Sequence, residues 1–146
     1  RRHDTGLAVA FIDLDHFKRI NDSFGHDAGD QVLRDCTQQM LASLRSTDSL
    51  LRWGGEEFVV IMPDTDREQA RLALARMVKD GLGARPDGSP VTASIGLAER
   101  CVDFAESADE LLDLADKRMY LAKTSGRNRL CFETPGELSE EPLSAA

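Results

Sequence analysis

Two glycines and two glutamates, Gly54-Gly55 and Glu56-Glu57, interrupt an apolar run near the middle of the chain. The flanking residues, 50–51 and 58–62, have the aliphatic, β-branched and aromatic character of strands. The glycines can adopt the positive φ of a tight hairpin turn and let a ligand approach the backbone closely. The glutamates then lie side by side at the turn, where their hard oxygens suit a magnesium ion. This pattern predicts a hairpin carrying a metal site, although taken alone such a turn is more often only a turn.

A second set of polar residues occurs upstream, in the segment 11–30. Its motifs are Asp-x-Asp at 13–15, Phe-Lys-x-Ile-Asn-Asp at 17–22, Gly-His at 25–26 and Gly-Asp at 29–30. Together with Gly-Gly-Glu-Glu-Phe at 54–58, this order resembles the signature of the GGDEF family of diguanylate cyclases. The resemblance extends from Arg1 to about Phe132. It implies the palm-like fold that nucleotidyl cyclases share with many polymerases.

The resemblance assigns metal binding to Asp13, Glu56 and the main-chain carbonyl of Leu14. Glu57 is expected to be a second-metal ligand or the group that activates the attacking hydroxyl. Joining nucleotides requires a 3′-hydroxyl to attack an α-phosphorus while pyrophosphate leaves, and divalent cations neutralise the charge that builds on oxygen. The expected ion is Mg²⁺, with Mn²⁺ as a substitute. Asp15 is expected to brace the turn after the first strand rather than to bind metal.

The resemblance implies that Lys18, Lys123 and Arg127 bind the phosphates of the substrate. Lys18 is also expected to be catalytic. The backbone amides of His16 and Phe17 lie at an expected helix start, where oriented N–H groups suit anions. For Lys123 and Arg127 an alternative stays open, because a glycine cap and a basic last turn also describe an ordinary helix end.

Recognition of guanine is assigned by the resemblance to Asn21 and Asp30. Asn21 offers both a donor and acceptors, whereas an ionised Asp30 offers acceptors for the guanine N–H groups. His26 is expected to line the same pocket, although a structural role at the Gly25 turn explains it equally well.

An Arg-x-x-Asp sequence, Arg45 to Asp48, lies shortly before Gly54, at the spacing of the family's product-inhibition site. A guanidinium can donate two hydrogen bonds to phosphate or guanine, and a carboxylate can accept from the guanine Watson–Crick edge. In isolation the same residues would be a surface ion pair of little energetic value. Arg76 occupies the position of a secondary inhibitory arginine, and a solvated helix face explains it equally well.

Hydrophobic periodicity predicts the elements that position these residues. Strands are expected at 7–12, at the two arms of the hairpin, at 91–95 and at 129–132, and helices at 28–44, from Thr65 to about Leu82, and from Ser107 to Lys123. Capping-box patterns mark the starts of the last two helices. This order predicts an α+β fold in which helices pack around a central mixed, mostly antiparallel sheet.

Composition indicates one domain, expected at 1–133, followed by a disordered tail at 134–146. The 146 residues are 41% hydrophobic and can build a single core. A net charge of −8 argues against nucleic-acid binding. The sequence contains no apolar stretch long enough to span a membrane, so a cytoplasmic domain is expected, although upstream segments of a longer protein could anchor it. The three cysteines suggest neither a disulfide framework nor a zinc site.

The expected function is the condensation of two GTP molecules into cyclic di-GMP, with feedback inhibition by the product. Each chain supplies one set of ligands for a symmetric product, so turnover is expected to require a homodimer. The start at Arg1 resembles a truncated domain, and an upstream sensor or dimerisation region is expected in the natural protein. Two alternatives remain at this stage: a weakly active receptor module that binds cyclic di-GMP or GTP, and another palm-type nucleotidyl cyclase or polymerase.

Overall fold

The computed structural model describes residues 6–133 and 140–142 of the chain. Its strands are β1 (Leu7–Leu14), β2 (Ser49–Gly54), β3 (Glu57–Pro63), β4 (Ala93–Glu99), β5 (Arg129–Cys131) and β6 (Glu140–Pro142). Its helices are α1 (Phe17–Phe24), α2 (His26–Ser43), α3 (Arg67–Asp80) and α4 (Ala108–Thr124).

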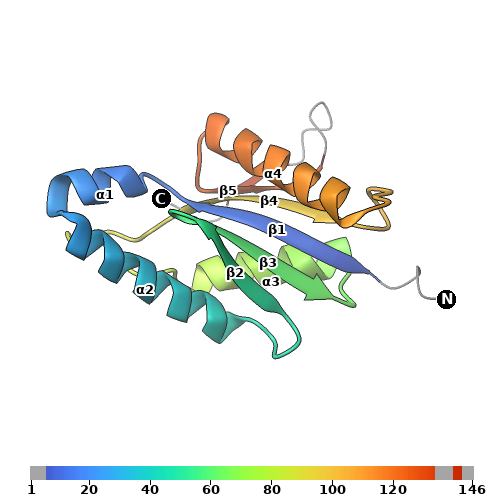
Figure 1. The fold of residues 1–146 in the computed structure, drawn as a ribbon, viewed down its shortest axis with the longest axis horizontal. Helices are drawn as coiled ribbons and strands as arrows, with labels where there is room; N and C mark the ends of the chain where they lie inside the picture. The colour runs from blue at the N-terminus through green and yellow to red at the C-terminus, as the bar shows by residue number, and fades with distance from the viewer. Residues whose placement is uncertain (1–5, 134–139, 143–146) are drawn as a thin grey trace.

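The described strands form one sheet with the order β2-β3-β1-β4-β5-β6 (Figure 1). The pair β4 and β5 is parallel, and the other neighbouring pairs are antiparallel. The predicted α+β fold with a mixed, mostly antiparallel sheet is therefore confirmed.

Helices cover both faces of the sheet because successive side chains of β1 point in opposite directions. Ala8, Ala10 and Ile12 belong to the core cluster that includes the buried residues of α2 and α3. Val9 and Phe11 instead pack in a second cluster with α4. Figure 1 shows the resulting layers, with α4 on one side of the sheet and α2 and α3 on the other.

Several boundaries differ from the sequence-based expectation. The helix expected to start at His16 and Phe17 is α1, whose two buried residues, Phe17 and Ile20, are too few for a recognisable period. Gly25 separates it from α2 with a φ of 92°. The strand expected at 91–95 is β4, which begins two residues later and continues to Glu99.

Helix α3 begins one residue later than predicted. Its N-cap is Asp66, whose side chain accepts from the Gln69 amide while the Gln69 side chain accepts from the Asp66 amide. Thr65 was therefore the wrong cap, and its hydroxyl has other partners. The cap of α4 is Ser107, as predicted, and accepts from the Glu110 amide. The Glu110 side chain accepts from Glu106 instead of completing a capping box.

In the tail, Glu140–Pro142 form β6, antiparallel to β5, where the sequence suggested disorder. Residues 134–139 and 143–146, also predicted to be disordered, lie outside the described residues. Across the described part of the chain, no helix has both the length and the apolar character needed to cross a membrane.

Candidate active site

The predicted metal ligands come from β1 and from the turn and first residue of β3. Asp13 lies near the end of β1, where its side chain is buried. In the antiparallel register of β1 and β3, Asp13 is opposite Glu57. One residue further on, the Leu14 amide donates to the Glu56 carbonyl at 3.2 Å. The hairpin therefore brings both glutamates to the end of β1, as the sequence predicted.

Helix α4 places a cation at the same end of the sheet. Lys123 Nζ lies 2.9 Å from Asp13 Oδ2. Burial raises the pKa of Glu57, and the negative charges of Asp13 and Asp116 raise it further. The carboxylates are thus close enough to repel one another, and a bound cation would reduce this repulsion.

The donor set fits a hard divalent cation in its chemistry, because it consists of carboxylates and a main-chain carbonyl. The side chains are not arranged as ligands, however: within residues 6–133 and 140–142, no three His, Cys, Asp or Glu side chains are grouped so that they could hold a metal ion. The Lys123 ammonium group contacts Asp13 instead. Metal binding by Asp13, Leu14, Glu56 and Glu57 therefore stays a prediction.

Asp15 is buried and braces the site, as the sequence analysis expected. Its carboxylate accepts from the hydroxyls of Thr92 and Ser94, each at 2.7 Å. It also accepts from the Asn128 amide at 2.9 Å. These bonds connect the end of β1 to β4 and to the loop between α4 and β5, on which Arg127 lies.

Two of the three predicted phosphate-binding cations lie at the C-terminal end of α4. Arg127 follows Lys123 in the loop to β5 and has a φ of 63°. His16 lies near it: burial lowers the pKa of His16, and the positive charges of Arg19 and Arg127 lower it further. Phe17 begins α1 directly after His16, so the predicted amide pair is at a helix start. Lys18 is highly exposed and forms an ion pair with Asp22 at 3.2 Å.

The predicted guanine-binding residues lie on α1 and α2. Asp30 is exposed on the first turns of α2 and lines a cavity of about 500 Å³. Asn21 is half-buried and packs against Gly29, since a Cβ built there would lie 1.8 Å from Asn21 Oδ1. His26 is the exposed first residue of α2. Arg52, which was not predicted, lines the Asp30 cavity from β2.

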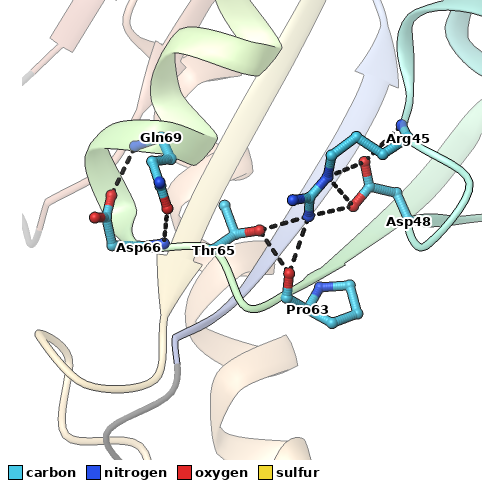
Figure 2. Close-up of polar contacts among 6 residues, drawn as sticks. All are labelled: Arg45, Asp48, Pro63, Thr65, Asp66 and Gln69. Carbon is cyan, nitrogen blue, oxygen red and sulfur yellow. Dashed lines mark hydrogen bonds and ion pairs between the residues drawn. The ribbon is translucent and has the colours of Figure 1, made fainter.

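The residues predicted to bind the product meet in a separate cavity of about 310 Å³, which Arg45, Asp48 and Arg76 all line. Arg45 Nη2 donates to Asp48 Oδ1 at 2.8 Å (Figure 2). Burial alone would raise the pKa of Asp48, but hydrogen bonds from Arg45 outweigh this effect and the pKa is lowered. Two further lining residues, Thr65 and Gln69, were not predicted, because no local sequence signal links them to Arg45.

Comparison with known proteins agrees with this fold. The family model described as "Diguanylate cyclase, GGDEF domain" matches residues 1–129. The fold is the palm-like α+β fold of these domains. The chain belongs to the GGDEF family of diguanylate cyclases.

Curated relatives are longer than this chain. The diguanylate cyclase DgcP of Pseudomonas aeruginosa is 40% identical over 135 residues, which are 89% of this chain and 20% of DgcP. The response regulator PleD of Caulobacter vibrioides is 41% identical over 133 residues, covering 84% of this chain and 28% of PleD. The chain thus spans less than a third of either relative.

Solved structures match over most of their own length. The active GGEEF domain of a diguanylate cyclase from Vibrio cholerae has a TM-score of 0.83 at 27% identity, covering 92% of this chain and 87% of that one. The GGDEF domain of DgcB from Caulobacter crescentus, in complex with c-di-GMP, has a TM-score of 0.78 at 31% identity. The match covers 89% of this chain and 79% of the DgcB chain.

Proposed function

We propose that this domain condenses two GTP molecules into cyclic di-GMP and two pyrophosphates. The observation that carries the proposal is the meeting of Asp13 with Glu56 and Glu57 at one end of the sheet, with Lys123 in contact with Asp13. Three buried or half-buried acids at one point are costly for folding unless they serve a cation or a reaction. The names of the relatives, DgcP among them, support the same activity.

Each residue has a definite task in this reaction. Asp13, Glu56, Glu57 and the Leu14 carbonyl would hold Mg²⁺, or Mn²⁺ in its place. When bound, the metal would neutralise charge developing on the phosphate oxygens. Lys18, Lys123 and Arg127, with the amides of His16 and Phe17, would hold the triphosphate. Lys123 must exchange Asp13 for phosphate when GTP binds, because its ammonium group is already in contact with that carboxylate.

Guanine would lie against α1 and α2, held by Asn21 and Asp30 and bordered by His26. A site that is built to hydrogen-bond the base leaves its polar groups unpaired when the wrong base enters. We therefore expect GTP to bind far better than ATP. Asp30→Ala should narrow the difference, and calorimetry with both nucleotides checks it. Equal affinity of the parent for GTP and ATP would contradict this assignment.

The domain would work as a homodimer, because the product has two equivalent halves and one chain supplies one set of ligands. An upstream sensor or dimerisation region in the full protein would control how the two chains meet. A cytoplasmic location suits a reaction that uses GTP.

The decisive test is direct synthesis. The purified chain is incubated with GTP and Mg²⁺, and the product is identified by mass and compared with the product formed from ATP. Cyclic di-GMP made from GTP is expected. If the chain binds GTP but makes no cyclic di-GMP even when dimerised artificially, the result supports the alternative, a receptor module that binds cyclic di-GMP or GTP.

We further propose feedback inhibition through Arg45, Asp48 and Arg76. Their shared cavity supports this proposal, since two cations and a carboxylate line it together. Asp48 must release Arg45 before it can accept from guanine, because its side chain is buried and both its oxygens are bound to Arg45. Arg45→Ala and Asp48→Ala should weaken cyclic di-GMP binding and prevent progress curves from flattening as product accumulates. Unchanged calorimetric affinity in both variants would exclude these residues as the inhibitory site.

A further inference from the structure

Thr65 is a polar residue that the fold buries beside the Arg45 cavity. It lies in the connection between β3 and α3. Its hydroxyl donates to the Pro63 carbonyl at 2.7 Å and accepts from Arg45 Nη2 at 2.7 Å (Figure 2). Because the hydroxyl proton is used on Pro63, the oxygen lone pairs of Thr65 are available to the guanidinium group.

One edge of the Arg45 guanidinium group is held by the protein. Nη2 has two hydrogens, which three acceptors share: besides Thr65, these are Asp48 Oδ1 at 2.8 Å and the Pro63 carbonyl at 2.9 Å. Nε lies 3.3 Å from both carboxylate oxygens of Asp48. The edge formed by Nε and Nη2 is thus occupied, while the side chain remains 52% exposed. A ligand in the cavity would therefore meet the remaining nitrogen, Nη1.

The contact with Thr65 also connects two elements that border the cavity. Arg45 and Asp48 lie in the turn between α2 and β2, whereas Arg76 lies on α3. Thr65 directly precedes Asp66, and the reciprocal bonds of Asp66 and Gln69 fix the first turn of α3. The hydrogen bond from Arg45 to Thr65 spans 20 residues of sequence and holds the two borders together.

We propose that Thr65 is a positioning residue of the product-binding cavity: it holds Arg45 in the orientation that accepts cyclic di-GMP. This inference rests on the proposed feedback function. Without the hydroxyl, Nη2 keeps Asp48 and Pro63 as acceptors but loses the one that connects it to the start of α3, so the guanidinium group is oriented less firmly. Binding of cyclic di-GMP must then immobilise the Arg45 side chain, and this loss of conformational entropy lowers the affinity.

The test compares two substitutions that differ in the hydroxyl. Thr65→Val removes it at nearly constant shape, and Thr65→Ser keeps it. We expect Thr65→Val to weaken cyclic di-GMP binding about tenfold by calorimetry, and Thr65→Ser to remain within about twofold of the parent. The inhibition constant of cyclic di-GMP, measured from initial rates with added product, should also rise about tenfold in Thr65→Val. It should not rise in Thr65→Ser. If Thr65→Val does not fold, Thr65→Ala takes its place in the comparison.

A second measurement separates positioning from general loss of structure. The Arg45 Nε–H resonance should move and broaden in Thr65→Val and return in Thr65→Ser, while thermal unfolding shows that both variants are folded. Equal affinity of Thr65→Val and the parent overturns the inference, as does equal weakening by Thr65→Val and Thr65→Ser.

Arg45→Ala tests the feedback site itself in the same experiment. If Arg45→Ala loses product binding while Thr65→Val does not, only the role of Thr65 is wrong. If Arg45→Ala binds as tightly as the parent, the feedback site is wrong and the role of Thr65 with it.

Discussion

Glu56 and Glu57 are adjacent in sequence but differ in their surroundings. The Glu56 carbonyl accepts from the Leu14 amide, so its backbone is fixed to the end of β1. Glu57 is opposite Asp13 in the next register position. In the proposed reaction the two carboxylates can therefore have separate tasks, with Glu56 as a metal ligand and Glu57 as a ligand of a second metal or as the group that activates the attacking hydroxyl.

The first prediction concerns Glu56. Glu56→Gln keeps the shape of the side chain and removes its charge, so the fold should persist while synthesis of cyclic di-GMP falls by about a hundredfold or more. Product formation at saturating GTP and Mg²⁺ measures the effect. Glu68→Gln is the matched control, since Glu68 pairs with Arg71 on α3 and exposed pairs have little energetic value. Activity of Glu56→Gln near that of the control would refute the assignment.

The second prediction concerns the pH dependence of stability without metal. Burial and neighbouring acids raise the pKa of Glu57 above its usual 4.5, so the folded state holds this proton more tightly than the unfolded state does. The free energy of unfolding therefore falls as pH rises from about 4.5 through the folded pKa. Glu57→Gln removes this contribution.

Thermal unfolding of metal-free parent and Glu57→Gln should reveal the difference. At low pH the two melting temperatures should be similar, and above the folded pKa the variant should be the more stable. Added Mg²⁺ should stabilise the parent more than the variant. A difference in melting temperature that does not change with pH would mean that Glu57 titrates normally.

At the scale of elements, the hairpin of β2 and β3 was predictable because its signals are local. Two glycines lie between two strand-like segments, and Gly55 indeed has a φ of 49°. Only the start of helix α1 was predicted, since eight residues with two buried side chains leave no period from which to read its length. The strand β6 was missed for a similar reason, because three residues within a polar tail carry no strand signal.

In the site, too, residues marked by local motifs were predicted, whereas contacts between remote segments were not. Motif spacing placed Asp13 and the two glutamates, which β1 and β3 then bring together. The contact between Asp13 and Lys123 joins residues 110 positions apart, and only the packing of α4 on the sheet creates it. Thr65 was mistaken for a helix cap, because its partner Arg45 is remote in sequence and the cap signal of Asp66 lies next to it.

The third prediction concerns the packing of α4. A Cβ built on Gly96 of β4 would lie 2.1 Å from both the Ala115 carbonyl oxygen and the Met119 amide nitrogen. Gly96→Ala must therefore displace α4 from the sheet, which should cost about 1–3 kcal/mol of stability. Since Lys123 lies near the end of the same helix, activity should fall as well. Denaturant unfolding and GTP turnover check both effects, and an unchanged midpoint would show that α4 is not held as described.

At the scale of the whole molecule, one chain of this domain is half of the proposed catalyst. It spans 20% of DgcP and 28% of PleD, so its relatives contain further sequence beyond the matched region. The net charge of −8 opposes close approach of two copies, and this repulsion is weaker at higher salt. Any segment that holds two chains together would raise their effective concentration.

The fourth prediction follows from this two-chain mechanism. The isolated domain should be mostly monomeric and slow, with an activity per chain that rises with protein concentration. Fusion to a parallel dimeric coiled coil should raise the specific activity, because encounter of two GTP-loaded sites becomes intramolecular. The gain should shrink at high protein concentration, where the unfused domain also dimerises. A coiled-coil fusion carrying Glu56→Gln is the control, since it dimerises equally but lacks the proposed metal ligand. Activity per chain that stays constant across the monomeric range of the unfused domain would contradict the need for two chains.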